Sequence, residues 1–396
     1  MDSSPKRVFL HVGAPKTGTS QLQDLLFLNR DVLREHGVLY PAERFDDHFM
    51  AALDLLGKEW GGLEERAPGA WDRLVAEVNA FEGPTVVISH EVLAGASAEQ
   101  AAMALSGLDG ELHVVCSARD LRRQVPAEWQ EGIKHRRTLT YAAFCADIRR
   151  EEPRTQLARW FWSVQDVPAV LARWGAVVAP ERVHLVTVPP PEAPRELLMQ
   201  RFLGLLGIDP DWLERPSDRA NASMGAVETT FIRKLNGRLP GSELPGDIYR
   251  PYVRELLVHR TLAGRPDSVR IALPDGLEDW VEQRAGRWLE QLADAGYDVV
   301  GDLAELAPGP PAGTWYDPDD VPEEQVELAL DVAETLLREL VVVTERHRHE
   351  LEEARRPPPH PPPGPWTRFK ERVVAAAGRK RGVGILYAAY RRIRRR

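Results

Sequence analysis

Short apolar runs recur along the first half of the chain, each bounded by polar turn residues and followed by a stretch with helical spacing. Four such runs are Val8–Val12, Thr85–Ser89, Glu111–Ser117 and Arg182–Val188. Strands that alternate with helices in this way predict a parallel sheet with helices on both faces. We therefore expect an α/β fold in which mostly helical insertions, at 49–81 and 120–174, separate the strand–helix units.

The pattern changes after the fourth run. Residues 220–300 have helical spacing, and Gly296–Gly301 closes this region. We interpret residues 1–307 as one domain. The rest of the chain is expected to form a linker (308–320), a long helical segment (321–356), a stiff spacer with seven prolines (357–365) and a basic amphipathic tail (366–396).

Length and composition are those of an ordinary globular protein, with 396 residues, 43% of them hydrophobic and 28% charged. The chain has no run of about 18 apolar residues and no signal-peptide pattern, so we expect a cytoplasmic protein. Cys116 and Cys145 are the two cysteines. Two cysteines exclude a disulfide framework and favour a reducing compartment.

The net charge of −9 is unevenly distributed. Residues 366–396 contain 11 Lys or Arg and one acid, so this tail carries about +10 and the rest of the chain about −19. A basic amphipathic segment beyond a proline spacer favours contact with an anionic membrane surface or an acidic partner. A solvated, disordered tail fits the composition equally well. Peripheral association with the inner membrane surface is therefore a hypothesis, and we expect no nucleic-acid partner.

A candidate phosphate loop, G-A-P-K-T-G-T-S, lies at Gly13–Ser20 between the first strand and a helix. The backbone N–H groups of such a turn and the positive end of the helix dipole make a site for an anion. Gly18 permits close backbone approach, and Lys16 adds a full positive charge. An ordinary polar turn is the alternative. We assign the anion site to six consecutive residues, Pro15, Lys16, Thr17, Gly18, Thr19 and Ser20.

This loop is not a Walker A motif, which needs a lysine directly after the second glycine, where Thr19 stands. The order P-K-T-G-T resembles the sulfotransferases that use 3′-phosphoadenosine 5′-phosphosulfate (PAPS), and Leu22-Gln23 matches bacterial members. The resemblance spans roughly residues 6–305, with specific motifs in the first 130 alone. It implies a P-loop-type fold in which the loop binds the 5′-phosphosulfate and Lys16 neutralises charge on the bridging oxygen. Positioning and charge stabilisation would carry most of the rate, without a metal.

A second cationic anchor is needed for the 3′-phosphate of PAPS. Arg119 directly follows the third apolar run, and the family has an arginine at such a strand end, followed by proline and, about eight residues later, by serine. Here Leu121 replaces the proline and Ala127 replaces the serine. Arg119 suits bidentate phosphate recognition at the carboxyl end of a strand, and Gln124 or Arg123 is a candidate for the missing contact. The alternative is that Arg119 pairs with Asp120 or another carboxylate.

His90 and Glu91 follow the second apolar run and are candidates for the catalytic base. In the family, a His or Glu in this position takes the proton of the acceptor. Either side chain can do so near neutral pH. The Ser-x-Glu pattern favours Glu91, whereas His90 stays open, and one of the two must merely cap a helix or bond the loop.

Weaker patterns complete the candidate site. Asn221 and Ser223, after Arg219, fit the late loop that closes over the nucleotide in the family, although a helix N-cap explains them equally well. Trp129 and Lys134 could line the acceptor cleft, but an aromatic residue on an amphipathic helix is more often core. No His or Cys cluster has metal-ligand spacing.

The resemblance implies transfer of a sulfuryl group from PAPS to a hydroxyl or amine of a small-molecule, sugar or lipid acceptor, with release of adenosine 3′,5′-bisphosphate. One alternative is a P-loop kinase-like enzyme, which would need a lysine after Gly18 and a strand-end Asp for Mg²⁺. The other is a non-catalytic member that binds nucleotide or a partner. Ala127 in place of serine would suit the second alternative.

Overall fold

The computed structural model describes residues 5–217, 223–238, 249–266 and 268–310, with Gly246 and scattered positions between 317 and 351. The chain divides into two compact units, residues 1–336 and 337–396. The linker, the spacer and the basic tail lie largely or wholly outside the described residues. Described positions of the expected helical segment, 346–351 among them, are helical. Within the described residues, no helix is long and apolar enough to cross a membrane.

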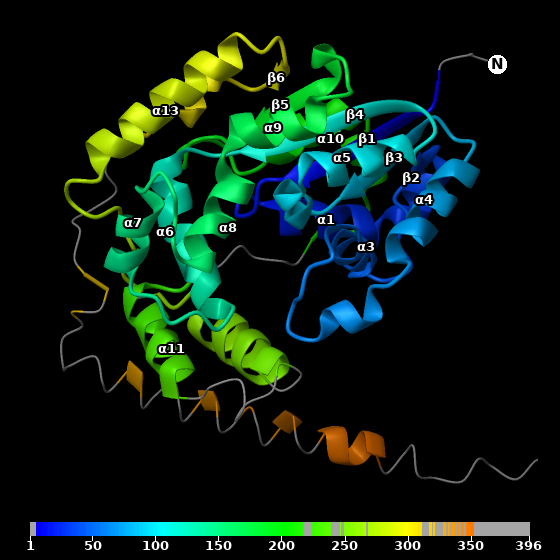
Figure 1. The fold of residues 1–396 in the computed structure, drawn as a ribbon. Coiled ribbons are helices and arrows are strands. Elements are labelled where there is room, and N and C mark those ends of the chain that lie inside the picture. Colours follow the sequence, from blue (N-terminus) through cyan, green and yellow to red (C-terminus); the bar gives the residue numbers. More distant parts are fainter. Residues whose placement is uncertain are drawn as a thin grey trace, which may run out of the picture. The chain divides into compact units, whose positions relative to one another are not determined.

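A parallel sheet forms the centre of the first unit (Figure 1), and the predicted α/β fold is confirmed. The described residues contribute six strands in the order β2-β3-β1-β4-β5-β6. All strand pairs are parallel. The strands are β1 (Arg7–Gly13), β2 (Val38–Leu39), β3 (Thr85–Ser89), β4 (Glu111–Ala118), β5 (Val183–Thr187) and β6 (Asp298–Val300).

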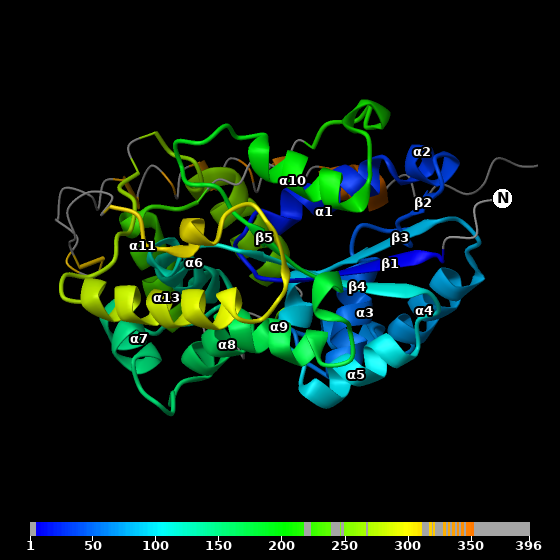
Figure 2. The same ribbon diagram turned by 90° about the horizontal axis from the view of Figure 1, so that it is seen from above.

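Alternation along β1 separates two cores on the two faces of the sheet. Val8 and Leu10 belong to the larger core, whereas Phe9 belongs to the smaller one. Successive side chains of a strand point to opposite faces, so this apolar run is buried on both sides. Figure 2 shows the helices in two layers, above and below the strands.

Three helices, α1 (Thr19–Leu28), α2 (Arg30–Glu35) and α10 (Leu197–Leu206), cover the face with Phe9. The opposite face carries α3 (Asp47–Leu56), α4 (Ala70–Ala80), α5 (Ala98–Ser106), α8 (Gln156–Gln165) and α9 (Val167–Gly175). The larger core also takes in α6 (Leu121–Lys134), α7 (Tyr141–Ile148), α11 (Ala226–Arg238), the π-helix η5 (Tyr249–Leu262) and α13 (Glu278–Ala293).

Helix α6 is the element that extends from the sheet into the site. Asp120 caps its first turn by accepting a hydrogen bond from the Arg123 backbone N–H at 3.0 Å. Trp129 is fully buried on the core side of the helix, and its indole N–H donates to Leu139 O at 2.8 Å. Trp129 is therefore core, the more frequent role for such a residue. This packing fixes the direction in which the opposite side of α6 faces.

Candidate functional site

The loop after β1 has the geometry of an anion site. Gly18 adopts a left-handed conformation (φ 89°) at the N-cap of α1, and no side chain caps this helix. The first N–H groups of an uncapped helix have no intrahelical acceptor, so they are free to bind an anion. Within the loop, the Thr17 hydroxyl donates to Ala14 O at 2.7 Å. Thr17 therefore shapes the loop, while Lys16 and Ser20 are partly exposed beside it.

Three adjacent strand ends bring the predicted residues together. β1 lies between β3 and β4 in the sheet. The loop that follows β1, the His90-Glu91 pair after β3 and Arg119 after β4 therefore share one edge of the sheet. They line a single cleft with a volume of about 3660 Å³. Ligands of open parallel sheets bind at this edge, where the chain passes from one side of the first strand to the other.

A buried histidine connects the three strands below the loop. His11 Nδ1 lies 2.8 Å from Ser89 Oγ on β3, and its Nε2 lies 3.0 Å from Ser117 Oγ on β4. Burial lowers the pKa of His11 to about 4, so the ring is neutral at neutral pH. The contacts hold the three strand ends in register.

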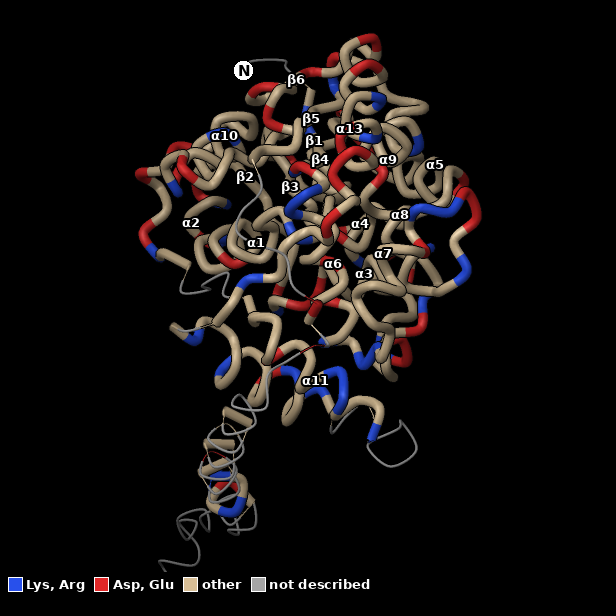
Figure 3. Tube along the Cα trace, turned by 90° about the vertical axis from the view of Figure 1, so that its left-hand side faces the viewer, with Lys and Arg blue, Asp and Glu red and all other residues tan. Residues whose placement is uncertain are grey.

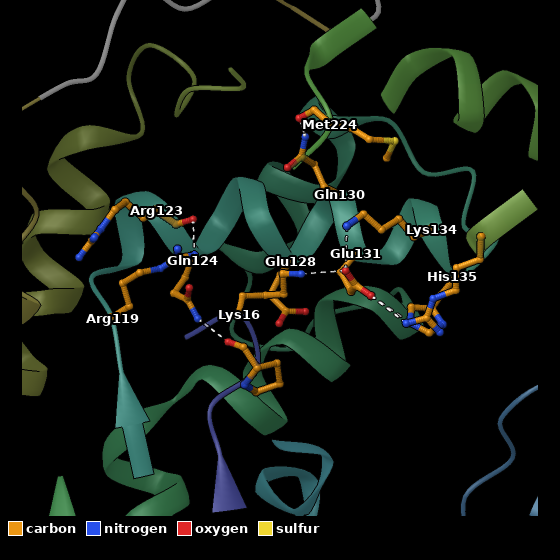
Figure 4. Close-up of polar contacts among 12 residues, drawn as sticks. Lys16, Arg119, Arg123, Gln124, Glu128, Gln130, Glu131, Lys134, His135 and Met224 are labelled. Atoms are coloured by element: carbon orange, nitrogen blue, oxygen red, sulfur yellow. Dashed lines mark hydrogen bonds and ion pairs between the residues drawn. The ribbon is translucent and has the colours of Figure 1, made fainter. Parts of the chain in front are cut away.

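Lys16 reaches across the cleft to helix α6 (Figure 4). Its Nζ lies 2.9 Å from Glu131 Oε2. Three more basic groups contact the same carboxylate: Lys134 Nζ at 3.4 Å, His135 Nε2 at 3.3 Å and a terminal nitrogen of Arg254 in η5 at 3.4 Å. Burial alone would raise the pKa of Glu131, but Lys16 and Lys134 outweigh it and hold that pKa well below its usual range. One carboxylate thus serves three cations.

Glu128 lies one turn before Glu131 on α6 and is almost wholly buried. Its Oε1 accepts a hydrogen bond from Gln165 Nε2 at 2.8 Å. Burial raises the pKa of Glu128 to about 7, although the charge of Lys16 and the bond from Gln165 limit the rise. The cleft therefore contains a carboxyl group that titrates near neutral pH, next to the loop lysine.

Arg119 is a cation at the end of β4 with few partners. One of its terminal nitrogens donates to Arg123 O at 3.0 Å, whereas its Nε is buried without a hydrogen bond. No carboxylate among the described residues lies within ion-pair distance of it. Asp120 instead pairs with Arg123. Burial, followed by the nearby Arg123, lowers the pKa of Arg119 to about 10, so it stays charged. A partly buried cation with no carboxylate at ion-pair distance favours an anionic ligand.

Gln124 lies beneath the loop. Its Nε2 donates to Pro15 O at 2.8 Å and to Gln165 Oε1 at 2.7 Å, and Gln165 Nε2 also donates to Pro15 O at 3.1 Å. The side chain is 1% exposed. In this geometry Gln124 supports the loop from α6 and does not present its amide to the cleft in the way that Arg119 presents its guanidinium.

His90 and Glu91 have different hydrogen-bond partners. His90 Nδ1 accepts a hydrogen bond from Val92 N at 3.3 Å, so the neutral ring carries its proton on Nε2. Glu91 accepts a bond from Gln23 Nε2 at 2.9 Å. Burial would raise the pKa of Glu91, but His90 and then Gln23 outweigh it and lower that pKa. Glu91 is thus ionised at neutral pH, and His90 serves as an N-cap.

The remaining predicted residues lie at the rim or beyond it. Ser223 is exposed and lines the cleft, while Arg219 and Asn221 lie outside the described residues. Lys134 lines the cleft and is 4% exposed. No group of three or more His, Cys, Asp or Glu among the described residues could hold a metal ion.

The sequence interpretation missed Glu128, Glu131 and Arg254. The two acids stand nine and twelve residues after Arg119, three apart on the same helix. That spacing places them on one side of α6, so it was a usable pattern. Arg254 had no such pattern, because its contact with Glu131 joins residues 123 positions apart.

No protein-family model and no curated protein sequence matches the chain. Among solved structures, it is similar to a sulfotransferase from Alicyclobacillus acidocaldarius, with 18% identity and a TM-score of 0.36 over 64% of this chain and 96% of that one. It is also similar to the sulfotransferase domain from the curacin biosynthetic pathway, with 10% identity and a TM-score of 0.32 over 75% of this chain and 99% of that one. At these identities and TM-scores, function has to be argued from the site itself.

Proposed function

We propose that this protein is a PAPS-dependent sulfotransferase. One observation carries the proposal: an uncapped helix N-terminus with Lys16 inside its loop lies at the same sheet edge as Arg119, a partly buried cation that has no carboxylate within ion-pair distance among the described residues. Two cationic anchors at adjacent strand ends fit a nucleotide with one anionic group at its 5′ end and another at its 3′ position. The order of the loop residues supports PAPS over a nucleoside triphosphate.

In the proposed reaction, an acceptor hydroxyl or amine attacks the sulfur of PAPS. A new bond to sulfur forms while the bond between sulfur and the bridging 5′-phosphate oxygen breaks, and the electron pair leaves with adenosine 3′,5′-bisphosphate. Lys16 stabilises the negative charge that develops on this oxygen, together with the N–H groups of the α1 terminus. To do so, Lys16 must share or give up its contact with Glu131.

Glu91 takes the proton of the acceptor in this proposal. It is ionised at neutral pH and held by Gln23 at the sheet edge. His90 is the poorer candidate, because its Nδ1 lone pair already accepts from Val92. Positioned proton transfer of this kind contributes about 10²- to 10⁴-fold in rate, so Glu91→Gln should keep nucleotide binding and lose turnover by a factor in that range.

A radiolabel assay tests the proposal. The protein is incubated with PAPS carrying ³⁵S and a panel of phenols, sugars, amines and lipid headgroups, and label in organic products is separated from free sulfate. We expect labelled product and adenosine 3′,5′-bisphosphate in equal amounts, and no product with Lys16→Ala. ATP–Mg²⁺ hydrolysis without sulfuryl transfer would favour a kinase-like enzyme. Binding of PAPS with neither transfer nor hydrolysis would favour a non-catalytic member.

A further inference from the structure

The cleft is basic although the first 365 residues carry about −19. Acidic and basic residues are interspersed along the described trace (Figure 3), but the described cleft lining holds 15 Lys or Arg against 12 Asp or Glu. The excess is concentrated on the wall formed by the end of α6 and by η5. There, residues 131–137 and 249–260 supply six Lys or Arg against two Glu. A basic wall in an acidic body favours anionic ligands over neutral ones.

The centre of this wall is the Glu131 cluster, where one carboxylate faces Lys16 and Lys134 (Figure 4). Arg254 of η5 contacts the same carboxylate. His135 adds no charge at neutral pH, because burial, and next to it Arg254, lowers its pKa. The cluster therefore has two positive charges in excess. Lys134 is 4% exposed, and Arg254 Nε is buried without a hydrogen bond. A buried lysine and a partly buried arginine that lack a full set of partners favour a second anion.

Position along α6 separates this wall from Arg119, the proposed anchor of the 3′-phosphate. Arg119 precedes the helix, and Lys134 is its last residue. A helix rises about 1.5 Å per residue, so about 20 Å of helix lies between its two ends. Lys16 contacts α6 at Glu131, close to the Lys134 end of the helix. A nucleotide that spans Arg119 and Lys16 therefore brings its 5′ end to this wall, so Lys134 and Arg254 lie beside the place where the acceptor meets the sulfuryl group.

We propose that Lys134 and Arg254 bind an anionic group of the acceptor, a carboxylate, sulfate or phosphate near the hydroxyl or amine that is sulfated. This inference rests on the proposed function, because the word acceptor presupposes sulfuryl transfer. The anion would replace part of the contact that Glu131 makes with both cations.

The test uses matched pairs of ligands that differ in one charge. The protein saturated with adenosine 3′,5′-bisphosphate is titrated with p-nitrophenyl glucuronide and p-nitrophenyl glucoside, and with p-hydroxybenzoate and p-hydroxybenzamide. We expect the anion of at least one pair to bind about tenfold or more tightly than its neutral partner, as charge-assisted hydrogen bonds do. Arg254→Gln and Lys134→Gln should remove that preference and leave binding of the neutral partner unchanged.

Arg182→Gln is the matched control, because Arg182 pairs with Glu111 at the opposite edge of the sheet. It should keep the preference. Equal binding within both pairs, or a preference that survives in Arg254→Gln and Lys134→Gln, would overturn the anion site while the nucleotide still binds. If adenosine 3′,5′-bisphosphate does not bind at all, the proposed function fails instead. The same pairs, titrated into the nucleotide-free protein, then decide the anion site alone.

Discussion

Neutralising Glu131 should tighten nucleotide binding, although the substitution removes a carboxylate that serves three cations. In Glu131→Gln, Lys16 loses its partner at 2.9 Å and becomes available to an incoming anion. An anionic oxygen bound to Lys16 would lie about 6 Å from the Glu131 carboxylate, and with an effective dielectric constant of about 20 their repulsion costs about 3 kcal/mol. Ions in solution and the other two cations screen part of it. We expect adenosine 3′,5′-bisphosphate to bind about 10- to 100-fold more tightly.

The same substitution should lower stability. Lys134 is buried and loses a contact at 3.4 Å, and three cations then face one another. Glu131 itself is partly exposed, so we expect a loss of about 2 kcal/mol rather than the larger cost of a fully buried pair. Calorimetry measures the affinity, and chemical denaturation measures the stability. Glu111→Gln, at the start of β4, is the control and should change neither affinity nor the cleft. Unchanged or weaker binding in a folded Glu131→Gln protein would refute this reasoning.

Three further predictions follow from the site and the core. Arg119→Ala should weaken adenosine 3′,5′-bisphosphate by about 10- to 100-fold in calorimetry but leave adenosine 5′-phosphate unchanged, because a charge-assisted contact to the 3′-phosphate is lost; equal losses for both nucleotides would argue against this role. Nucleotide affinity should rise as pH falls through about 7, because a bound anion favours protonated Glu128. After correction for the titration of the nucleotide itself, Glu128→Gln should make affinity less dependent on pH. An unchanged pH dependence in this variant would exclude Glu128 as the group responsible. Trp129→Ala should lower the free energy of unfolding by about 3–5 kcal/mol in denaturant titration, whereas Met103→Ala, 56% exposed, should change it by less than about 0.5 kcal/mol; equal effects would contradict the packing of α6.

The strands with strong local patterns were predictable from the sequence. The predicted strand Thr85–Ser89 has the same bounds as β3, and β4 is one residue longer than the predicted strand Glu111–Ser117. Continuous apolar runs between polar turns are typical of strands buried on both faces. The pattern did not predict β2 and β6, which have two and three residues and lie at the edges of the sheet. Such short edge strands bury too little to have a pattern of their own.

In the site, too, the residues within a local sequence pattern could be predicted, and the contacts that depend on packing could not. The loop at Gly13–Ser20 could be located because strand, glycine turn and helix follow one another in the chain, and its chemistry depends on backbone geometry. Arg119 could be placed by its position at a strand end. Its ion pairing could not, because Asp120 has Arg119, Arg122 and Arg123 within three positions, and packing selects Arg123. The contact between Arg254 and Glu131 depends on how η5 packs against α6, which no local pattern encodes.

Calorimetric titration with adenosine 3′,5′-bisphosphate tests the central claim most directly, with adenosine 5′-phosphate and ATP–Mg²⁺ as comparisons. The two-anchor site predicts micromolar binding that requires the 3′-phosphate and that weakens in both Lys16→Ala and Arg119→Ala. A preference for ATP–Mg²⁺, or binding that ignores the 3′-phosphate, would contradict the assignment of the loop and Arg119 to PAPS.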